Sequence, residues 1–364
     1  STNYGESWKE ITGNIPYGAY TRVVREDEVR KGLLLAGTEL GVYISFNDGK
    51  SWERFNLNMP VLAVTDLMIK HDDLIVATQG RSFWILDDMG LIRQMDDTKE
   101  TRLFNPENST IGNWYSQLNS NYSDGTSTFT GVNPANGVVI YYNLNEGDHD
   151  QKLTVKIYDE NNKLIREINN QTNKNFISYN GGPSREAVLT NNIGLNRFVW
   201  NTRHKSLIGV PYAYIEGRFS GHKAIPGKYK LLLEVGDKSY TSEFKILKNP
   251  NFNVSDSDYS EYDQYTSHME KKFNEMAEYI NINISSIDKL NGVINNIKNN
   301  EDIKNNGKSL LNKMDLWDKK MMQRKSLAYD DVENFPNKFL ADYLFILDEI
   351  KGDIPNVSKG ILKS

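Results

Sequence analysis

Two octets of the sequence match each other closely, and this repeat is the strongest constraint on the fold. The first is Ser1-Thr-Asn3-Tyr-Gly5-Glu-Ser7-Trp8, and the second, which begins 44 positions later, is Ser45-Phe-Asn47-Asp-Gly49-Lys-Ser51-Trp52. A degenerate third copy follows, in which residues 73–78 match 33–38 and residues 83–85 match 42–44. Because the intervening segments consist of short strand-forming runs, a repeat of about 40 to 45 residues is typical of β-propeller blades.

The octet has the composition of a turn between two strands. The side chain at its third position, Asn3 or Asn47, can accept hydrogen bonds from backbone amides of the turn. Gly5 and Gly49 allow a positive φ, and Trp8 and Trp52 can pack the turn against a sheet. We therefore predict a structural role for the eight residues Ser1, Asn3, Gly5, Trp8, Ser45, Asn47, Gly49 and Trp52.

The octet resembles the Asp-box, Ser-x-Asp-x-Gly-x-Thr-Trp, of sialidases and sortilin-type propellers, with Asn in place of Asp. Segments 35–45, 76–88 and 131–140 resemble the closing blades, and the domain after them, of large bacterial secreted proteins labelled sortilin-like or BNR-repeat glycosyl hydrolase. The resemblance implies a secreted, periplasmic or cell-surface location. It implies no proven reaction, since the hydrolase label rests on the repeat and one fold hosts many functions.

Composition changes along the chain predict four regions. Residues 1–103 are expected to form terminal propeller blades, and residues 104–135, rich in Asn, Ser, Thr and Gly, a linker. Strand patterns at 138–143, 153–158, 164–168, 197–200, 228–235 and 239–246 then predict an immunoglobulin-like β-sandwich over 136–249.

Residues 250–364 show helical periodicity and are expected to form an antiparallel bundle. A helix should start near Ser255, which has Asp258 three residues later. Apolar residues then recur every three or four positions from Met269 to Ile297. Two further stripes, at 310–321 and 339–350, supply the other helices.

The bulk composition excludes several classes of function. The net charge of -5 gives no basic field for a nucleic acid, and the absence of cysteine excludes disulfides and thiolate metal sites. No run approaches the ~18 apolar residues of a membrane span. The five histidines show no metal-ligand spacing, so no metal or cofactor is predicted. Ser1 lies inside a running motif, so we expect a fragment of a longer protein whose signal peptide lies upstream.

Candidate site residues fall in two places. Glu39 and Asp88 are the catalytic candidates that we retain in the repeat region, and both occupy turn or repeat-equivalent positions. The long connection over residues 203–224 carries aromatic and charged residues typical of a contact surface. The interpretation that we favour is a flap that lies across the propeller as a seal between domains. The binding candidates in it are Arg203, Tyr212, Tyr214, Arg218 and Phe219.

Two hypotheses of function follow. In the first, the chain belongs to a non-catalytic extracytoplasmic protein that binds a protein or a glycan, and its partners include the remaining propeller blades. In the second, the parent protein is a glycoside hydrolase whose catalytic residues lie in other blades. We favour the first, because the motifs specify turns and strands without an acid, base or nucleophile set.

Overall fold

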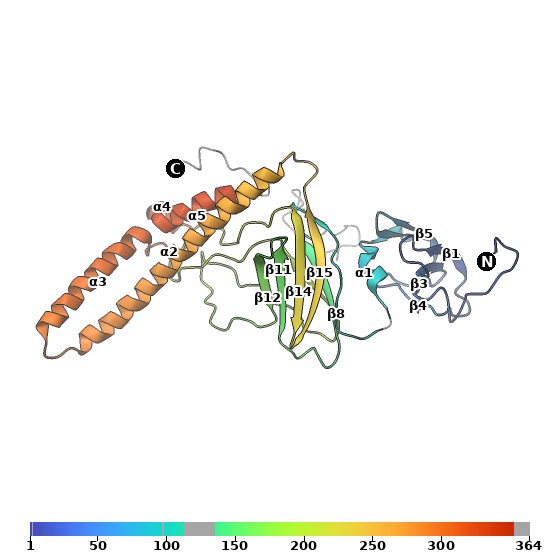
Figure 1. Ribbon diagram of the computed structural model, residues 1–364, viewed down its shortest axis with the longest axis horizontal. Coiled ribbons are helices and arrows are strands. Elements are labelled where there is room, and N and C mark those ends of the chain that lie inside the picture. Colours follow the sequence, from blue (N-terminus) through green and yellow to red (C-terminus); the bar gives the residue numbers. More distant parts are fainter. Residues whose placement is uncertain (2, 97, 113–134, 353–364) are drawn as a thin grey trace. The chain divides into compact units, whose positions relative to one another are not determined.

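The computed structural model describes residues 1, 3–96, 98–112 and 135–352, which form two compact units. The first unit contains Ser1–Glu100 and Phe104–Glu107, and the second contains Thr101–Leu103 and the residues from Asn108 onward. Figure 1 shows both, with the β-sheets of each unit and the helices of the second. Each unit is described separately below.

The first unit consists of two antiparallel sheets and a short helix. The first sheet has the order β1-β2-β3-β4, with strands Thr21–Glu26, Leu34–Thr38, Gly41–Ser45 and Glu53–Arg54. The second has the order β5-β6-β7, with strands Val64–Lys70, Asp73–Thr78 and Phe83–Leu86, and is followed by helix α1, Met89–Gln94. Leu35, Val42, Val64 and Leu67 lie in one core that both sheets share. The two sheets therefore follow the sequence repeat, and the complete propeller stays a prediction.

The two octets form the same hydrogen-bonded turn. Asn3 Oδ1 accepts from the Ser7 amide at 3.0 Å, and Asn47 Oδ1 accepts from the Ser51 amide at 2.9 Å. In each turn the first serine hydroxyl also accepts from the glycine amide four residues later. Both glycines have positive φ, 91° for Gly5 and 75° for Gly49. Asn thus supplies the acceptor that the turn requires, without the charge of Asp.

The second unit begins with two sheets that pack around one core. One has the order β13-β10-β8 and the other β12-β11-β14-β15-β9. Trp200, Tyr229 and Phe244 contact one another inside the core, with ring centroids 5.6 to 6.2 Å apart. The strands are β8 Arg102–Leu103, β9 Ser109–Thr110, β10 Val138–Leu144, β11 Leu153–Asp159, β12 Leu164–Asn169, β13 Gly194–Trp200, β14 Gly227–Val235 and β15 Lys238–Leu247. The unit is thus a two-sheet β structure, and its assignment as an immunoglobulin-like sandwich stays a prediction.

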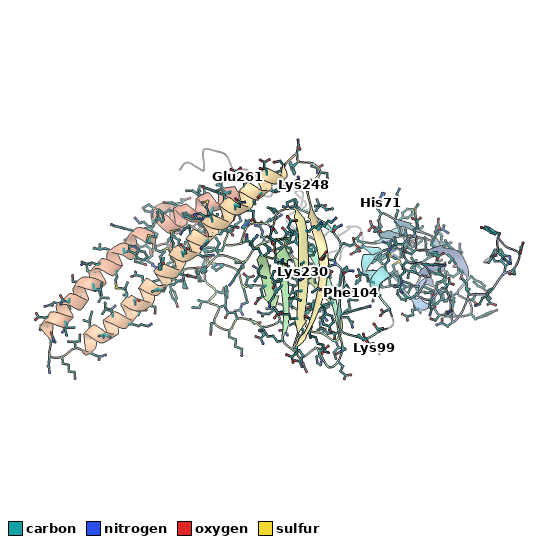
Figure 2. The ribbon with its side chains drawn as sticks, viewed as in Figure 1. His71, Lys99, Phe104, Lys230, Lys248 and Glu261 are labelled. Carbon is teal, nitrogen blue, oxygen red and sulfur yellow. The ribbon has the colours of Figure 1, made fainter. Side chains whose placement is uncertain are left out.

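Helices follow the last strand of this unit. Lys248, labelled in Figure 2 at the junction of β15 and α2, pairs with Asp256 at 2.7 Å. Ser255 and Asp258 form a capping box at the start of α2, because each side chain accepts from the backbone amide of the other. In Figure 1 helices α2 and α3 run side by side as a long hairpin, and α5 lies along α2. The helices are α2 Asp256–Asn296, α3 Glu301–Met321, α4 Asp331–Asn334 and α5 Phe339–Ile350.

The structure divides the chain differently from the four predicted regions. Strand β8 lies at the end of the predicted blade region and β9 lies in the predicted linker. They pair with β10 and β15 of the second unit, respectively. The rest of the linker, residues 113–134, lies outside the described residues. The predicted sandwich and helical regions form one unit, since Tyr259 of α2 lies in the core of the sheets. Among the described helices, none is long and apolar enough to cross a membrane.

Candidate ligand-binding sites around residues 203–224

The long connection between β13 and β14 packs against the helices of its own unit. Its buried apolar residues share a core with α2 and α5, and Phe219 makes an edge-to-face contact with Phe273 of α2 at 6.0 Å. The buried members from the connection are Leu207, Val210, Ala213, Ile215 and Phe219. We expected either an open contact surface or a flap over the propeller. The described contacts instead make most of this segment part of the core beneath the helices.

The five predicted binding residues therefore separate into different environments. The Tyr214 amide donates to the Ser326 carbonyl at 2.8 Å, and the Arg218 amide donates to Asp348 Oδ2 at 2.6 Å. Phe219 is buried, so Tyr214, Arg218 and Phe219 together fix the connection to the helical part of the unit. Tyr212 is 72% exposed, and Arg203 lines a separate cavity. Tyr212 and Arg203 are thus the two of the five that line the cleft or the cavity, whereas the exposed side chain of Arg218 lies outside both linings.

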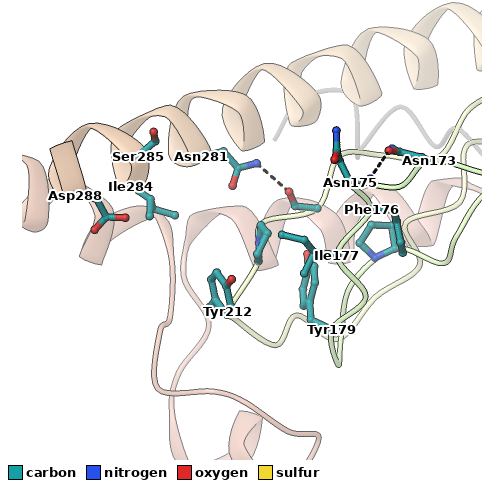
Figure 3. Close-up of a pocket in the computed structure, with 13 residues that line it drawn as sticks. Asn173, Asn175, Phe176, Ile177, Tyr179, Tyr212, Asn281, Ile284, Ser285 and Asp288 are labelled. Atoms are coloured by element: carbon teal, nitrogen blue, oxygen red, sulfur yellow. Dashed lines mark hydrogen bonds between the residues drawn. The ribbon is translucent and has the colours of Figure 1, made fainter.

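Tyr212 lies at a cleft of about 480 Å³ within the second unit. Residues 173–183 and 209–212 form one side of the cleft and helix α2 the other, as Figure 3 shows. The aromatic residues of the lining are Phe176, Tyr179 and Tyr212, and its polar residues include Asn175, Asn281, Ser285 and Asp288. The cleft thus offers apolar ring faces together with amide, hydroxyl and carboxylate groups.

The cleft is held in place by short-range contacts. Asn281 Nδ2 donates to the Gly209 carbonyl at 3.0 Å, which ties α2 to the loop (Figure 3). Tyr212 has φ of 64°, a left-handed conformation that is costly for a bulky residue. Tyr212 follows Pro211 in a turn, and a positive φ after proline is typical of such a turn. The turn leaves the Tyr212 ring exposed at the rim of the cleft.

A cluster of charged groups is buried a short distance along α2. His222 Nδ1 lies 2.8 Å from Glu270 Oε2, and His222 Nε2 lies 3.1 Å from Asp263 Oδ1. Lys351 Nζ lies 3.5 Å from the other oxygen of Glu270. Burial alone lowers the pKa of His222, but the two carboxylates outweigh burial and raise it. A protonated His222 therefore bridges both carboxylates and joins the connection to α2.

The ring of His204 lies against this cluster and, unlike that of His222, is neutral. Burial, followed by the positive charge of His222, lowers its pKa to about 3, so its ring is neutral. Its ring stacks on that of His222, with centroids 3.9 Å apart and planes 15° apart. Among the residues that the structure describes, buried His204 Nε2 has no hydrogen-bond partner, and it lies 3.7 Å from Asp263 Oδ1.

Ligand atoms of His204, His222 and Asp263 lie within 4.8 Å of one another, which raises the question of a metal site. A cation binds each imidazole in the plane of the ring, along the lone pair of the nitrogen. The two ring planes are nearly parallel and stacked, so they do not meet at a point close to both nitrogens. The geometry fits a neutral ring stacked on a charged one better than it fits a preformed metal site.

Sequence spacing gave no indication of this cluster, because its histidines are 18 positions apart and come together through the fold. The sequence of helix α2 carries a pattern that could have predicted the buried cluster. Asp263 and Glu270 are seven residues apart, so they share one face of the helix with the buried Thr266 and Phe273. Carboxylates on the buried face of a helix require partners of opposite charge.

The two catalytic candidates of the first unit have structural partners. Glu39 Oε1 accepts from Arg22 Nε at 2.8 Å. Asp88 caps α1, since its Oδ1 accepts from the Gly90 amide at 2.8 Å. Burial, with Asp72 and Asp73 nearby, nevertheless raises the pKa of Asp88. Glu39 lies in the turn between β2 and β3, and Asp88 caps the start of α1 after β7. The two carboxylates therefore lie in loops of different sheets rather than in one pocket.

Comparison with known proteins gives little information. No family model matches the chain, and no curated protein matches it. One solved structure that matches is the extracellular domain of a hybrid two-component system from B. thetaiotaomicron. The match has 11% identity and a TM-score of 0.17, and it covers 64% of this chain and 26% of the other. The chain thus spans about a quarter of the length of that neighbour.

Proposed function

We propose that the chain is a non-catalytic part of an extracytoplasmic protein and binds a glycan in the cleft beside Tyr212. The observation that carries this proposal is the exposed ring of Tyr212 opposite polar side chains of α2. The C–H groups on one face of a sugar ring pack well on an aromatic side chain. Its hydroxyls form hydrogen bonds with amide, hydroxyl and carboxylate groups such as those of Asn281, Ser285 and Asp288.

The extracytoplasmic location is proposed on the resemblance of the two octets to the Asp-box of secreted proteins. The non-catalytic role is supported by the positions of Glu39 and Asp88. Two carboxylates that hydrolyse a glycosidic bond stand on either side of it, roughly 5 to 10 Å apart. Glu39 is instead paired with Arg22, and Asp88 caps α1. These partners give Glu39 and Asp88 structural roles rather than the roles of a catalytic pair.

We expect the rest of the second unit to act as a rigid support for the cleft. Tyr212 belongs to the connection between β13 and β14. The buried ion pairs of His222 with Asp263 and Glu270 fix this connection to helix α2. The same helix supplies Asn281, Ser285 and Asp288 to the cleft. Both sides of the cleft are thereby held before a ligand arrives, which lowers the entropic cost of binding.

The test is a glycan-binding screen of the whole chain, followed by calorimetric titration of the glycans that bind. Tyr212→Ala should weaken binding at least tenfold, a loss of about 1.4 kcal/mol or more. Tyr279→Ala is the matched control, because Tyr279 is an exposed tyrosine of α2 outside the cleft lining. Its affinity should stay within twofold of the unsubstituted protein. Failure of every glycan to bind, or equal losses in both variants, would refute the proposal.

A further inference from the structure

A separate cavity of about 320 Å³ in the second unit is lined by three arginines. Arg166 comes from strand β12, Arg185 from the segment between β12 and β13, and Arg203 from the connection after β13. The hydroxyl-bearing residues Ser184, Ser206 and Ser220 also line it. None of the residues that line this cavity belongs to the lining of the Tyr212 cleft, although Arg185 of the cavity contacts Phe176 of the cleft.

The lining of the cavity carries an excess of positive charge. Its one carboxylate, Glu186, pairs with Arg166, which leaves the two charges of Arg185 and Arg203. Within the described part of the chain, neither of these arginines forms an ion pair. His204 also lines the cavity and is neutral, so it offsets nothing. Excess charge in a concave, partly enclosed site favours an anionic ligand, because low-dielectric walls focus the field.

The two unpaired arginines are held by contacts that leave donors available. Arg203 donates from Nη1 to the Gly221 carbonyl at 2.9 Å, which fixes its side chain by one of its five N–H groups. The guanidinium of Arg185 lies over the ring of Phe176, 5.4 Å from the centroid. A stacked guanidinium keeps its N–H groups in its own plane, free to meet an acceptor at its edge.

We propose that this cavity binds an oxyanion, the carboxylate or phosphate group of a small ligand, between Arg185 and Arg203. The forked N–H groups of arginine match the paired oxygens of either group, and serine hydroxyls can donate to the remaining oxygens. Arg166, whose Nη1 donates to the His204 carbonyl at 3.0 Å, positions the wall of the site rather than the ligand.

The proposal is tested on the whole chain at low ionic strength, since salt screens such contacts. Thermal unfolding and calorimetric titration are measured with inorganic phosphate, with glucuronate and with glucose. We expect saturable binding and a raised Tm with phosphate, glucuronate or both, and neither effect with glucose. Binding of only one anion would identify the oxyanion that the cavity accepts. Absence of saturable binding by both anions would overturn the proposal.

Variants separate this cavity from general charge attraction. Arg203→Gln should weaken anion binding at least tenfold, and Arg203→Lys should weaken it less, because lysine keeps the charge without the fork. Arg185→Gln serves as a second variant, since Arg185 is exposed and its replacement leaves the core intact. Arg197→Gln removes the same charge from an exposed position of β13 outside the cavity and should stay within twofold. An equal loss in Arg197→Gln would show that the anions bind without a defined site.

Discussion

Trp8 and Trp52 occupy the same position of the repeated octet, yet their surroundings differ. Trp8 is 81% exposed, whereas Trp52 is 3% exposed and packs with Leu34, Ala36 and Tyr43. The Trp52 indole also donates to the Ile11 carbonyl at 2.8 Å. The octet therefore determines the turn, and the sheet around it determines whether the tryptophan is buried.

This contrast predicts different costs for the same substitution. Trp52→Ala should lower the free energy of unfolding by about 3 to 5 kcal/mol, because it removes a large buried ring. Trp8→Ala should change it by no more than about 0.5 kcal/mol. Denaturant unfolding of the whole chain, with hydrogen exchange of β2 and β3 to report on the first unit, measures both. Similar losses in the two variants would show that the turn, and not burial, sets the cost.

A second residue-scale prediction concerns His204, which faces His222, Asp263 and Glu270. Folding lowers the pKa of His204 from its ordinary value of 6.5 to about 3. Between these two pH values the unfolded chain binds a proton at His204 and the folded chain does not. Stability should therefore fall as the pH drops below 6.5, by up to about 1.4 kcal/mol per pH unit. The pKa of His222 is raised in the folded chain, so its ion pairs contribute stability below pH 6.5. This contribution is lost as the pH rises from 6.5 through the folded-state pKa.

The measurement compares the whole chain with His204→Gln, which cannot titrate. Urea unfolding at pH 7 and pH 4.5 should show a loss on acidification that is about 2 kcal/mol larger in the unsubstituted protein. The other titrating groups are common to both proteins, so the difference isolates His204. An identical loss in the two proteins would mean that His204 is not held neutral in the fold.

At the scale of elements, the sequence predicted long strands and helices well. The pattern at residues 153–158 corresponds to β11, Leu153–Asp159, and the cap at Ser255 begins α2. Strands β8 and β9 could not be predicted, because each has two residues and exists only through pairing with a distant strand. Helix α1 has six residues, which make fewer than two turns. Periodicity needs several residues to show itself, and such elements have too few.

The buried ion cluster predicts how strongly α2 is joined to the rest of its unit. Glu270→Gln removes the charge that His222 and Lys351 both face, and it should destabilise the unit by about 3 to 5 kcal/mol. Glu278→Gln, at an exposed position of the same helix, is the control and should be nearly neutral. Urea unfolding of both variants measures the difference. A loss below about 1 kcal/mol in Glu270→Gln would show that the cluster does not hold the helix.

At the scale of the whole molecule, the sequence separated regions that the structure joins. The change from strand to helix patterns near residue 250 suggested a domain boundary, but the connection at 203–224 fills the space beneath the helices. Its apolar residues have no regular period, so their burial could not be predicted from the sequence. The composition of this connection indicated Tyr212 and Arg203 as binding candidates, but it could not show the neighbours that they meet only in the folded unit.

The central claim is that the chain binds a glycan in the Tyr212 cleft, and ligand-dependent hydrogen exchange tests it most directly. Exchange of backbone amides is compared for the whole chain with and without a saturating glycan from the screen. The account predicts added protection at residues 173–183, 209–212 and 281–288, which form the cleft. Protection confined to strands β1 to β7 of the first unit, with none at these residues, would contradict it.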